Sequence, residues 1–433
     1  MLRGPLSYIL KKLAKAVVDK YQPQIIGITG SVGKTTTKEA ILMVLAKKYR
    51  IRGNIKNYNN EIGLPLTILG LESPGRSIIG WLSVIRAAFN LLHHRDANYP
   101  EFVVLEMGVD HPGDIDYLLS IVKPTIGVVT AIGQAHLEFF GSQDKIAAEK
   151  AKLITSLPPD GYSILNADDQ RVLAMAEHSQ AKVITYGFGS QAMVRASDLS
   201  FNYEKSSQLA VADLPGLEFN LNYQDAVIPL VMTSVISEAV VSSVLAAVAV
   251  GLSQGIGLLD ITKALVDFHV PKGRLNILSG SRQRVLLDDS YNASPTSVVT
   301  AVNILSRLPV DSAKQRVAIL GDMLELGVDG PAEHRRLGQI IAQLPIGQLV
   351  LIGPLAGLIG QEAQQQGWVG KTDYFPDAVS ASSLLDQLIP SAAVVLLKGS
   401  QGTRLEKLTK ILLADQTKAA DCLVRQEERW LNS

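Results

Sequence analysis

Short apolar runs alternate with amphipathic stretches through most of this chain of 433 residues. Four early runs are continuous and rich in β-branched residues, at 24–30, 101–108, 125–133 and 161–169. Such runs are typical of strands buried on both faces of a parallel sheet, and helical patterns separate them at 34–49 and 142–157. The alternation predicts βαβ units, and therefore an α/β domain that binds its ligand at the carboxyl ends of the strands.

The pattern changes in the second half of the chain. From 190 to 230, polar and apolar residues alternate between turn signals, which predicts antiparallel strands or hairpins. Helical patterning follows at 234–267, and the segment 269–278, with its proline and glycine, predicts a linker. Strand-like runs then resume at 284–290, 316–323, 348–353 and 392–400. We therefore expect a domain boundary near 273 and a second, smaller α/β domain after it.

Two further stretches are apolar at helical spacing. In residues 1–23, the residues Ile9, Leu10, Leu13, Val17 and Val18 fall on one helical face, and lysines interrupt the apolar runs too often for a signal peptide. This segment is either a helix docked on its own domain or a basic amphipathic helix on a membrane surface. The stretch 77–94, inside an apolar insertion at 71–100, is too short to span a membrane. It is either a buried or interface helix or a second point of membrane contact, so a membrane or protein partner would bind through 1–20 or 77–94.

Composition narrows the class of protein. Lysine plus arginine equals aspartate plus glutamate, at 41 each, which argues against a nucleic-acid partner. The only cysteine is Cys422, so the chain has neither a disulfide framework nor a cysteine-based zinc cluster. A reducing, cytoplasmic location fits this composition.

The most informative local stretch is "GITGSVGKTTTKEA" at 27–40, between a predicted strand and a predicted helix. The strict phosphate-loop pattern requires a glycine where Ile28 stands. Gly30 and Gly33 nevertheless allow the backbone amides to face phosphate oxygens at a helix N-terminus. Lys34 reaches terminal phosphates and the Thr35 hydroxyl suits Mg²⁺. The alternative is a glycine-rich turn that binds nothing.

Two other residues are candidates for metal binding. Glu106 ends the run "FVVLE", where a carboxylate at a strand tip would lie beside the phosphate loop. His136 follows another predicted strand by a few residues. A histidine is an unusual but available ligand for Mg²⁺, and otherwise His136 is a packed or solvent-facing loop residue.

A series of longer motifs makes a resemblance specific. After the phosphate loop come "NYNNEIGLPLTIL" (57–69), "VLEMG" (104–108), "GVVTAIGQAHLEFFGS" (127–142), "LLDDSYNASPTS" (286–297), "LGDMLELG" (320–327) and "LLKGSQGTRLE" (396–406). In this order they resemble the Mur ligase family over about 24–410, and most closely the branch that adds D-alanyl-D-alanine to a muramoyl tripeptide. That family writes its phosphate loop with Thr-Gly-x-x-Gly-Lys-Thr, so Ile28 is expected. The resemblance implies a central P-loop ATPase-type parallel-sheet domain at 24–272 and a smaller Rossmann-like α/β domain at 273–433.

The resemblance also implies a reaction and its cofactors. ATP phosphorylates a substrate carboxylate, and an amine then attacks the acyl phosphate to form an amide, with Mg²⁺ as the metal. The implied phosphate-binding residues are Gly30, Ser31, Gly33, Lys34, Thr35 and Thr36. Thr35 and Glu106 would bind a first Mg²⁺, and His136 with Lys150 a second. Lys150 matches a lysine that is often carbamylated in the family, and its alternative is an ordinary solvated helix lysine.

The remaining implied residues concern the substrates. Asn59, Asn60 and Glu61 would lie near the γ-phosphate and the acceptor carboxylate, and Asn60 would join Lys34, Lys150 and His136 as a catalytic residue. In the second domain, Arg274, Asp289 and Tyr291 would bind the nucleotide, and Asn292 would line the same cleft. Lys398, Ser400 and Arg404 would bind the carboxylate of the amine substrate, unless they are ordinary surface loop residues.

Two departures from the family pattern keep other functions open. Only 23 residues precede the first predicted strand, so we expect the family's N-terminal domain, which binds uridine diphosphate, to be absent. The helix at 237–250 has Ala239, Val240 and Ser243 where the family usually has a His-Asn pair and a further asparagine. The alternatives are a ligase of the same superfamily with another carboxylate and amine pair, or a degenerate nucleotide-binding scaffold.

Overall fold

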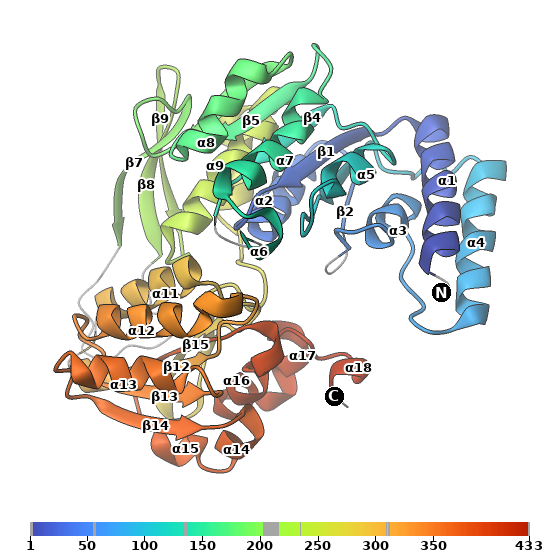
Figure 1. Ribbon diagram of the computed structural model, residues 1–433. Helices are drawn as coiled ribbons and strands as arrows, with labels where there is room; N and C mark the ends of the chain where they lie inside the picture. The colour runs from blue at the N-terminus through green and yellow to red at the C-terminus, as the bar shows by residue number, and fades with distance from the viewer. Residues whose placement is uncertain are drawn as a thin grey trace. The chain divides into compact units, whose positions relative to one another are not determined.

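The computed structural model describes residues 3–54, 58–133, 137–201, 216–233, 235–308, 310 and 312–431. These residues form two compact units. The first unit comprises the described residues up to Ser200, together with Glu218–Met232 and Glu238–Phe268. The second unit comprises the described residues from His269 onward, together with those of Phe201–Leu217 and Thr233–Ser237. Each unit is an α/β structure built on its own sheet, as the sequence predicted (Figure 1).

The sheet of the first unit has nine strands in the order β2-β3-β1-β4-β5-β6-β7-β8-β9. Their bounds are β1 Gln24–Thr29, β2 Ile51–Gly53, β3 Phe102–Glu106, β4 Ile126–Val129, β5 Tyr162–Asn166, β6 Lys182–Gly187, β7 Val194–Phe201, β8 Leu217–Tyr223 and β9 Ala226–Met232. Neighbouring strands from β2 to β7 pair in parallel. The β-branched runs are therefore buried parallel strands, as predicted.

The segment 190–230 differs in part from the prediction. β8 and β9 are joined through Gln224 and Asp225 alone and are neighbours in the sheet, so they form a hairpin. β7 instead pairs in parallel with β6. β7 is also a neighbour of β8, and the sequence did not predict its parallel pairing with β6, because a strand that continues a parallel sheet while one face meets solvent shows the same alternation as a hairpin strand.

Helices cover both faces of this sheet. The helices are α1 Arg3–Tyr21, α2 Lys34–Leu45, α3 Gly63–Leu69, α4 Ile78–His93, α5 Asp114–Leu119, α6 Leu137–Phe140, α7 Gln143–Thr155, α8 Gln170–Leu173, α9 Glu238–Ser253 and α10 Leu258–Leu265. α2 packs against α9 and α10 on one face. On the other face, residues of α3, α5 and α7 share a core with strand residues such as Val103 and Val129. The carboxyl ends of β1, β3 and β4 are left for loops that carry the candidate site.

The predicted N-terminal helix is α1, and it packs against α3 and α4. Its residues Leu10, Leu13, Ala14 and Val17 are at most 7% exposed. Burying these side chains accounts for the apolar spacing read from the sequence, so the interpretation of a helix docked on its own domain is correct for this face. Within the described part of the chain, no helix is both long enough and apolar enough to cross a membrane.

The sheet of the second unit has six strands in the order β10-β11-β15-β12-β13-β14. Their bounds are β10 Asn276–Ser279, β11 Val285–Asp289, β12 Arg316–Gly321, β13 Gln348–Ile352, β14 Lys371–Phe375 and β15 Val394–Lys398. β10 pairs antiparallel with β11 and the other neighbours pair in parallel. The predicted linker 269–278 was therefore wrong at its end, because Asn276–Leu278 belong to the edge strand β10. Pro271 and Gly273 precede this strand, and the ladder to β11 stabilises it.

Alternate residues of each inner strand face two separate cores. The helices of this unit are α11 Pro295–Arg307, α12 Gly330–Ile341, α13 Gly357–Gln365, α14 Ala378–Ser382, α15 Leu385–Leu388, α16 Glu406–Leu412, α17 Ala419–Cys422 and α18 Glu428–Leu431. On β12, Ala318 and Leu320 belong to the core under α11, α12 and α13. Val317 and Ile319 belong to the core under α14, α15 and α16. This alternation is what a sheet covered on both faces requires.

Candidate active site

The phosphate-loop motif forms the turn between β1 and α2. Gly30 has φ 146° and Gly33 has φ 86°, and Gly33 is the N-cap residue of α2. These backbone conformations are readily available only to glycine. Because the N-cap residue Gly33 has no side chain, the first amides of α2 have no side-chain cap. Lys34 folds back along the loop, and its Nζ donates to the Gly30 carbonyl at 2.6 Å. The turn therefore presents amides and an ammonium group together, which suits an anion.

The loop that follows β4 supports this turn. The Ser31 amide donates to the Ala131 carbonyl at 2.8 Å, and the Gly133 amide donates to Ser31 Oγ at 2.8 Å. Thr130 Oγ1 donates to the Val32 carbonyl at 2.5 Å. Thr130 is only 6% exposed and was not among the residues predicted from the sequence. The sequence feature that could have identified Thr130 is its position directly after an apolar strand, next to the strand that leads into the phosphate loop.

Gly30→Ala is expected to lower both stability and nucleotide affinity. A Cβ at this position would lie 1.9 Å from Thr130 Oγ1, and φ 146° is strained for any side chain. We expect a loss of about 1–3 kcal/mol in the free energy of unfolding, measured in denaturant, and weaker ATP binding by calorimetry. Gly4→Ala is the matched control, because an added Cβ there meets nothing within 4 Å. Unchanged stability and affinity in Gly30→Ala would contradict this account of the turn.

Glu106 lies beside the start of α2. It is the last residue of β3 and pairs in register with Ile28 of β1. It is 5% exposed, and its Oε2 accepts from Thr35 Oγ1 at 3.2 Å. Its Oε1 lies 3.4 Å from Lys38 Nζ, but this buried oxygen has no hydrogen bond from any described residue. A buried carboxylate oxygen that lacks a donor, next to a threonine hydroxyl, fits a hard divalent cation.

Lys38 and Asn54 hold this carboxylate in place, although the sequence did not single them out. Lys38 is 2% exposed, and its Nζ donates to the Asn54 carbonyl at 2.7 Å. Asn54 Oδ1 accepts from the Glu106 amide at 2.6 Å. Lys38 follows Lys34 by one turn of α2. This helical spacing is the sequence feature that could have placed Lys38 on the same side of the helix as Lys34.

Lys150 is buried in the same unit. It lies on α7 and is 2% exposed, so it is not a solvated helix lysine. Burial and the positive charge of Lys34 lower its pKa to about 7, while Asp110, Glu149 and Asp114 act in the opposite direction. Lys150 therefore lies within electrostatic range of the phosphate loop on one side and of the acids after β3 on the other. A lysine with this pKa is about half uncharged in neutral solution and largely uncharged at higher pH.

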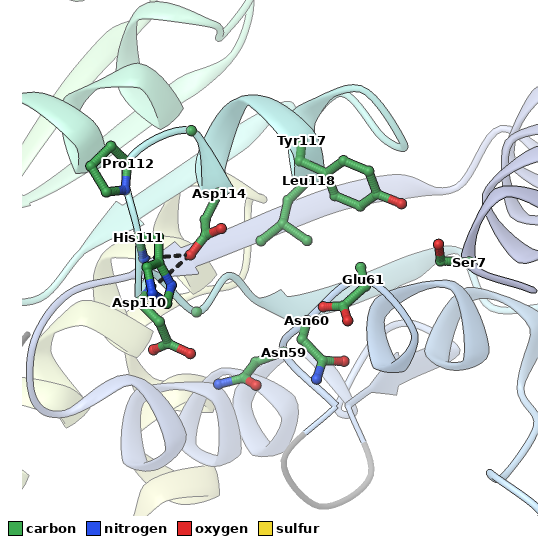
Figure 2. A pocket seen from close by; sticks show the side chains of 12 residues that line it. Ser7, Asn59, Asn60, Glu61, Asp110, His111, Pro112, Asp114, Tyr117 and Leu118 are labelled. Atoms are coloured by element: carbon green, nitrogen blue, oxygen red, sulfur yellow. Dashed lines mark hydrogen bonds between the residues drawn. The ribbon is translucent and has the colours of Figure 1, made fainter. Parts of the chain in front are cut away.

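A pocket of about 480 Å³ opens beside the end of β3 (Figure 2). It is lined by Ser7, Asn59, Asn60, Glu61, Gly108, Asp110, His111, Pro112, Gly113, Asp114, Tyr117 and Leu118. Figure 2 shows the Asn59–Glu61 segment on one side and the Asp110–Asp114 loop across from it. The structure thus brings the three predicted substrate residues of the first unit to one cavity, together with three residues that the sequence did not single out, Asp110, His111 and Asp114.

Backbone hydrogen bonds fix both walls of this pocket. Asp114 Oδ2 accepts from the amides of Asp110 at 2.9 Å and His111 at 2.7 Å. Glu149, the residue before Lys150, accepts from the Gly113 and Ile115 amides at 3.0 Å each. On the opposite wall, Asn60 Oδ1 accepts from the Gly63 amide at 2.9 Å and steadies the start of α3. The pocket is therefore built from positioned polar groups, with Glu61, Asp110 and Asp114 as its acids.

His136 lies outside the described residues, and the second metal site stays a prediction. Among the described residues, no three histidine, cysteine, aspartate or glutamate side chains converge in a way that could hold a metal ion. We propose Thr35 and Glu106 as protein ligands for a first cation. Mg²⁺ is commonly bound in this way, by one or two protein groups with phosphate oxygens and water completing the shell.

The predicted residues of the second unit meet at the end of β11. Lys398 Nζ lies 2.6 Å from Asp289 Oδ2 and donates to the Asn292 carbonyl at 3.1 Å. The Arg274 guanidinium stacks on the Tyr291 ring, with 3.9 Å between Cζ and the ring centroid. Lys398 and Asp289 are 2% and 7% exposed. The structure therefore brings these five residues together and makes Lys398 and Asp289 a buried ion pair.

Ser400 and Arg404 have different surroundings. Ser400 is 4% exposed, accepts from the Leu324 amide at 2.8 Å and donates to the Ala293 carbonyl at 3.3 Å. Arg404 Nε lies 2.6 Å from Glu406 Oε1, and Glu406 also pairs with Arg425 at 3.0 Å. Arg425 in turn donates to the Tyr291 carbonyl. Ser400 and Arg404 are therefore built into the frame around Tyr291, and they are not solvent-exposed loop residues.

Comparison with known proteins assigns both units of the chain to one family. The description "Mur ligase middle domain" matches residues 28–79 and 83–251, and "Mur ligase, glutamate ligase domain" matches residues 273–401. The UDP-N-acetylmuramoyl-tripeptide–D-alanyl-D-alanine ligase of Mycobacterium tuberculosis strain H37Rv is 31% identical over 428 residues, covering 94% of this chain and 77% of the relative. The chain belongs to the Mur ligase family.

Two further relatives support the assignment. The ligase of the same name from Bacillus subtilis strain 168 is 29% identical over 404 residues, covering 93% of this chain and 79% of the relative. A crystal structure of MurF from Acinetobacter baumannii is 27% identical with a TM-score of 0.74, covering 92% of this chain and 79% of that one. The resemblance inferred from the motifs is confirmed, and the chain is an ATP-dependent peptide ligase of the Mur type.

The structure also describes the three residues of α9 that the sequence analysis set against the family pattern. Ala239 is exposed, whereas Val240 and Ser243 are 6% and 4% exposed. Ser243 Oγ donates to the Ala239 carbonyl at 3.1 Å and lies 3.5 Å from the position that a Cβ on Gly33 would take. A small hydroxyl residue at this position therefore packs directly under the phosphate loop, which the sequence pattern alone did not reveal.

Proposed function

We propose that this Mur ligase joins D-alanyl-D-alanine to a muramoyl tripeptide in peptidoglycan synthesis, through an acyl phosphate. One observation carries the proposal: the phosphate loop, Glu106, Lys150 and a polar pocket converge at the carboxyl edge of one parallel sheet. The names of the relatives, which are ligases of this specificity, support the choice of substrates. The chain spans 77–79% of the length of these two relatives.

The proposed reaction has two steps. The terminal phosphoryl group of ATP passes to an oxygen of the acceptor carboxylate, which forms an acyl phosphate and releases ADP. The amine nitrogen of the dipeptide then attacks the acyl carbon, loses a proton, and inorganic phosphate leaves with the electrons of its C–O bond. Both steps bring anions together, so most of the catalytic effect comes from positioning and from positive charge.

Within this proposal, the loop at Gly30–Thr36 binds the phosphates of ATP. Lys34 neutralises the transferring phosphoryl group, and the amides of Gly33 and its neighbours contact the other phosphate oxygens. Mg²⁺ fits beside Thr35 and Glu106, because Glu106 retains a buried oxygen without a hydrogen bond from a described residue. Bound there, the ion would neutralise phosphate charge.

Lys150 is the second basic residue of the proposal. As an ammonium group, it would be costly to bury and would repel Lys34. As a carbamate, it would carry a negative charge and oxygen ligands toward a cation, with His136 as the other expected ligand. Carbamate formation requires the neutral amine, and the lowered pKa of Lys150 supplies it at neutral pH. Its neighbour Glu149 fixes the pocket loop, so Lys150 also lies next to the proposed acceptor site.

The acceptor carboxylate is assigned to the pocket between Asn59–Glu61 and Asp110–Asp114. Asn59 and Asn60 offer amide donors for a carboxylate and for the acyl phosphate that forms from it. In the second unit, Arg274, Asp289 and Tyr291 are assigned to the nucleotide. Asn292, Lys398, Ser400 and Arg404 are assigned to the amine substrate. Because Lys398 is buried, we assign it a positioning role, in which it holds Asp289 and the Asn292 carbonyl in place.

The experiment is phosphate release from ATP and Mg²⁺ with defined substrate pairs. With a UDP-muramoyl tripeptide and D-alanyl-D-alanine, we expect phosphate and a new amide in equal amounts, and neither product when the acceptor is omitted. Turnover only with another carboxylate and amine pair would assign a different specificity within the superfamily. ATP binding without turnover on any pair would identify a nucleotide-binding scaffold. We also propose a cytoplasmic location, and a peripheral membrane or protein partner that binds through 1–20 or 77–94.

A further inference from the structure

Helix α4 carries apolar side chains on its packed face and on its exposed face. Its inner face carries Val84 and Ala88, which are 7% and 0% exposed, and Trp81 and Ile85 pack partly against the same core. Its outer face carries Ile78, Ile79, Leu82 and Phe89, which are 71%, 80%, 62% and 49% exposed, together with the exposed polar residues Ser83, Arg86, Asn90 and His93. Several large exposed apolar side chains gathered on one helix face mark an interaction surface. The outer face of α4 therefore lacks a covering layer within the described chain.

The charges along this face are mostly basic. Residues 73–95 include Arg76, Arg86 and Arg95 and contain no aspartate or glutamate, and the acids nearest in sequence are Glu72 and Asp96. All three arginines are exposed, and His93 and His94 at the C-terminal end of α4 are exposed as well. An apolar stripe that carries mainly cationic side chains is complementary to a surface that is apolar inside and anionic outside.

Helix α1 lies alongside α4. Lys20 Nζ donates to the carbonyls of Leu91 and Leu92 at 2.8 and 2.9 Å, so the C-terminal ends of α1 and α4 lie together. The two helices run side by side in the same direction (Figure 1). Near the start of α1, Tyr8 and Ile9 are 61% and 41% exposed.

We propose that the outer face of α4, with the adjoining end of α1, binds the surface of an anionic lipid membrane. α4 would lie in the membrane plane, with its apolar side chains among the acyl chains and its arginines at the headgroups. It does not cross the membrane, because no helix of the described residues is long and apolar enough. A second copy of the chain is the weaker alternative, since it would bring two sets of arginines on α4 together.

Sedimentation with lipid vesicles tests this proposal on the full chain. We expect binding to phosphatidylcholine vesicles that contain phosphatidylglycerol, little binding to phosphatidylcholine alone, and release by added salt. Arg76→Glu with Arg86→Glu should weaken binding at least about fivefold for each arginine removed. Ile78→Ser, Ile79→Ser and Leu82→Ser together should weaken it further, by about tenfold for each side chain that inserts fully.

The controls separate membrane binding from general stickiness and from misfolding. Val328→Ser with Val369→Ser removes two side chains of the second unit that are 95% and 98% exposed, and vesicle binding should not change. Thermal unfolding of every variant should match the parent, because all the substituted side chains are exposed. Absence of binding to anionic vesicles at low salt would overturn the proposal. Dimerisation that the triple serine variant abolishes, without vesicle binding, would instead assign the face to a second copy.

Discussion

Lys34→Ala is expected to abolish phosphate release from ATP, while the protein remains folded. Lys34 is the only side chain of the described loop 30–34 that brings a positive charge to the terminal phosphates, and it is held there by the Gly30 carbonyl at 2.6 Å. Removing a positioned group that stabilises developing charge costs about 10²–10³-fold in kcat, and the fall should be at least that large here. The measurement is coupled phosphate release at saturating ATP.

Two companion variants make this result specific. Lys34→Arg keeps the charge but not the compact ammonium group, so it should recover little activity. Lys47→Ala removes an exposed lysine just after α2 and should leave the rate unchanged. Thermal unfolding should show all three variants folded. If Lys34→Ala turns over ATP at the parent rate, the loop does not bind the transferring phosphate, and the assignment of the ATP site fails.

Lys150→Met is expected to have the second largest effect. Methionine fills the buried volume but cannot be carbamylated or bind a cation, so activity should fall by about 10²-fold or more. In the parent, activity should depend on dissolved carbon dioxide and should rise as pH increases through about 7, because only the uncharged amine of Lys150 reacts. Isotope-labelled bicarbonate followed by NMR would detect the carbamate directly.

The same residue predicts a pH dependence of stability in buffer free of carbon dioxide. The pKa of Lys150 is lowered in the folded protein to about 7 from its ordinary 10.5, so between these values the unfolded chain binds more protons. The free energy of unfolding should therefore rise with pH across this window, by up to about 1.4 kcal/mol per pH unit. Lys150→Met should lose this slope.

Lys145→Met is the matched control for both readouts, because Lys145 is an exposed lysine on the same helix. It should keep the activity of the parent, its response to carbon dioxide and its pH slope. An active Lys150→Met protein, or a parent whose NMR spectrum shows no carbamate under saturating bicarbonate, would remove the carbamate from the proposal. The Lys34 assignment would be unaffected by that outcome.

The sequence by itself determined the elements that depend on local pattern. The strands β1, β3, β4 and β5 were predictable because a strand buried on both faces leaves an unbroken apolar run. The phosphate loop was predictable because one contiguous segment supplies its glycines, its lysine and the helix that follows. The family was predictable because its motifs are contiguous and occur in a fixed order.

Only the tertiary structure decided what depends on contacts between distant segments. The helical pattern of 142–157 does not show that Lys150 is buried within range of Lys34, and its lowered pKa follows from that burial. The pocket joins Ser7, Asn59 and Asp110 from three separate segments. Thr130 supports the phosphate loop from the end of the neighbouring strand β4. The sequence of the apolar stretch 77–94 is compatible with either a buried helix or a membrane-facing helix. The structure shows that this helix packs one face against α1 and the core and leaves another face uncovered. Periodicity records which side chains share a face, whereas burial, charge and pKa are set by what that face meets.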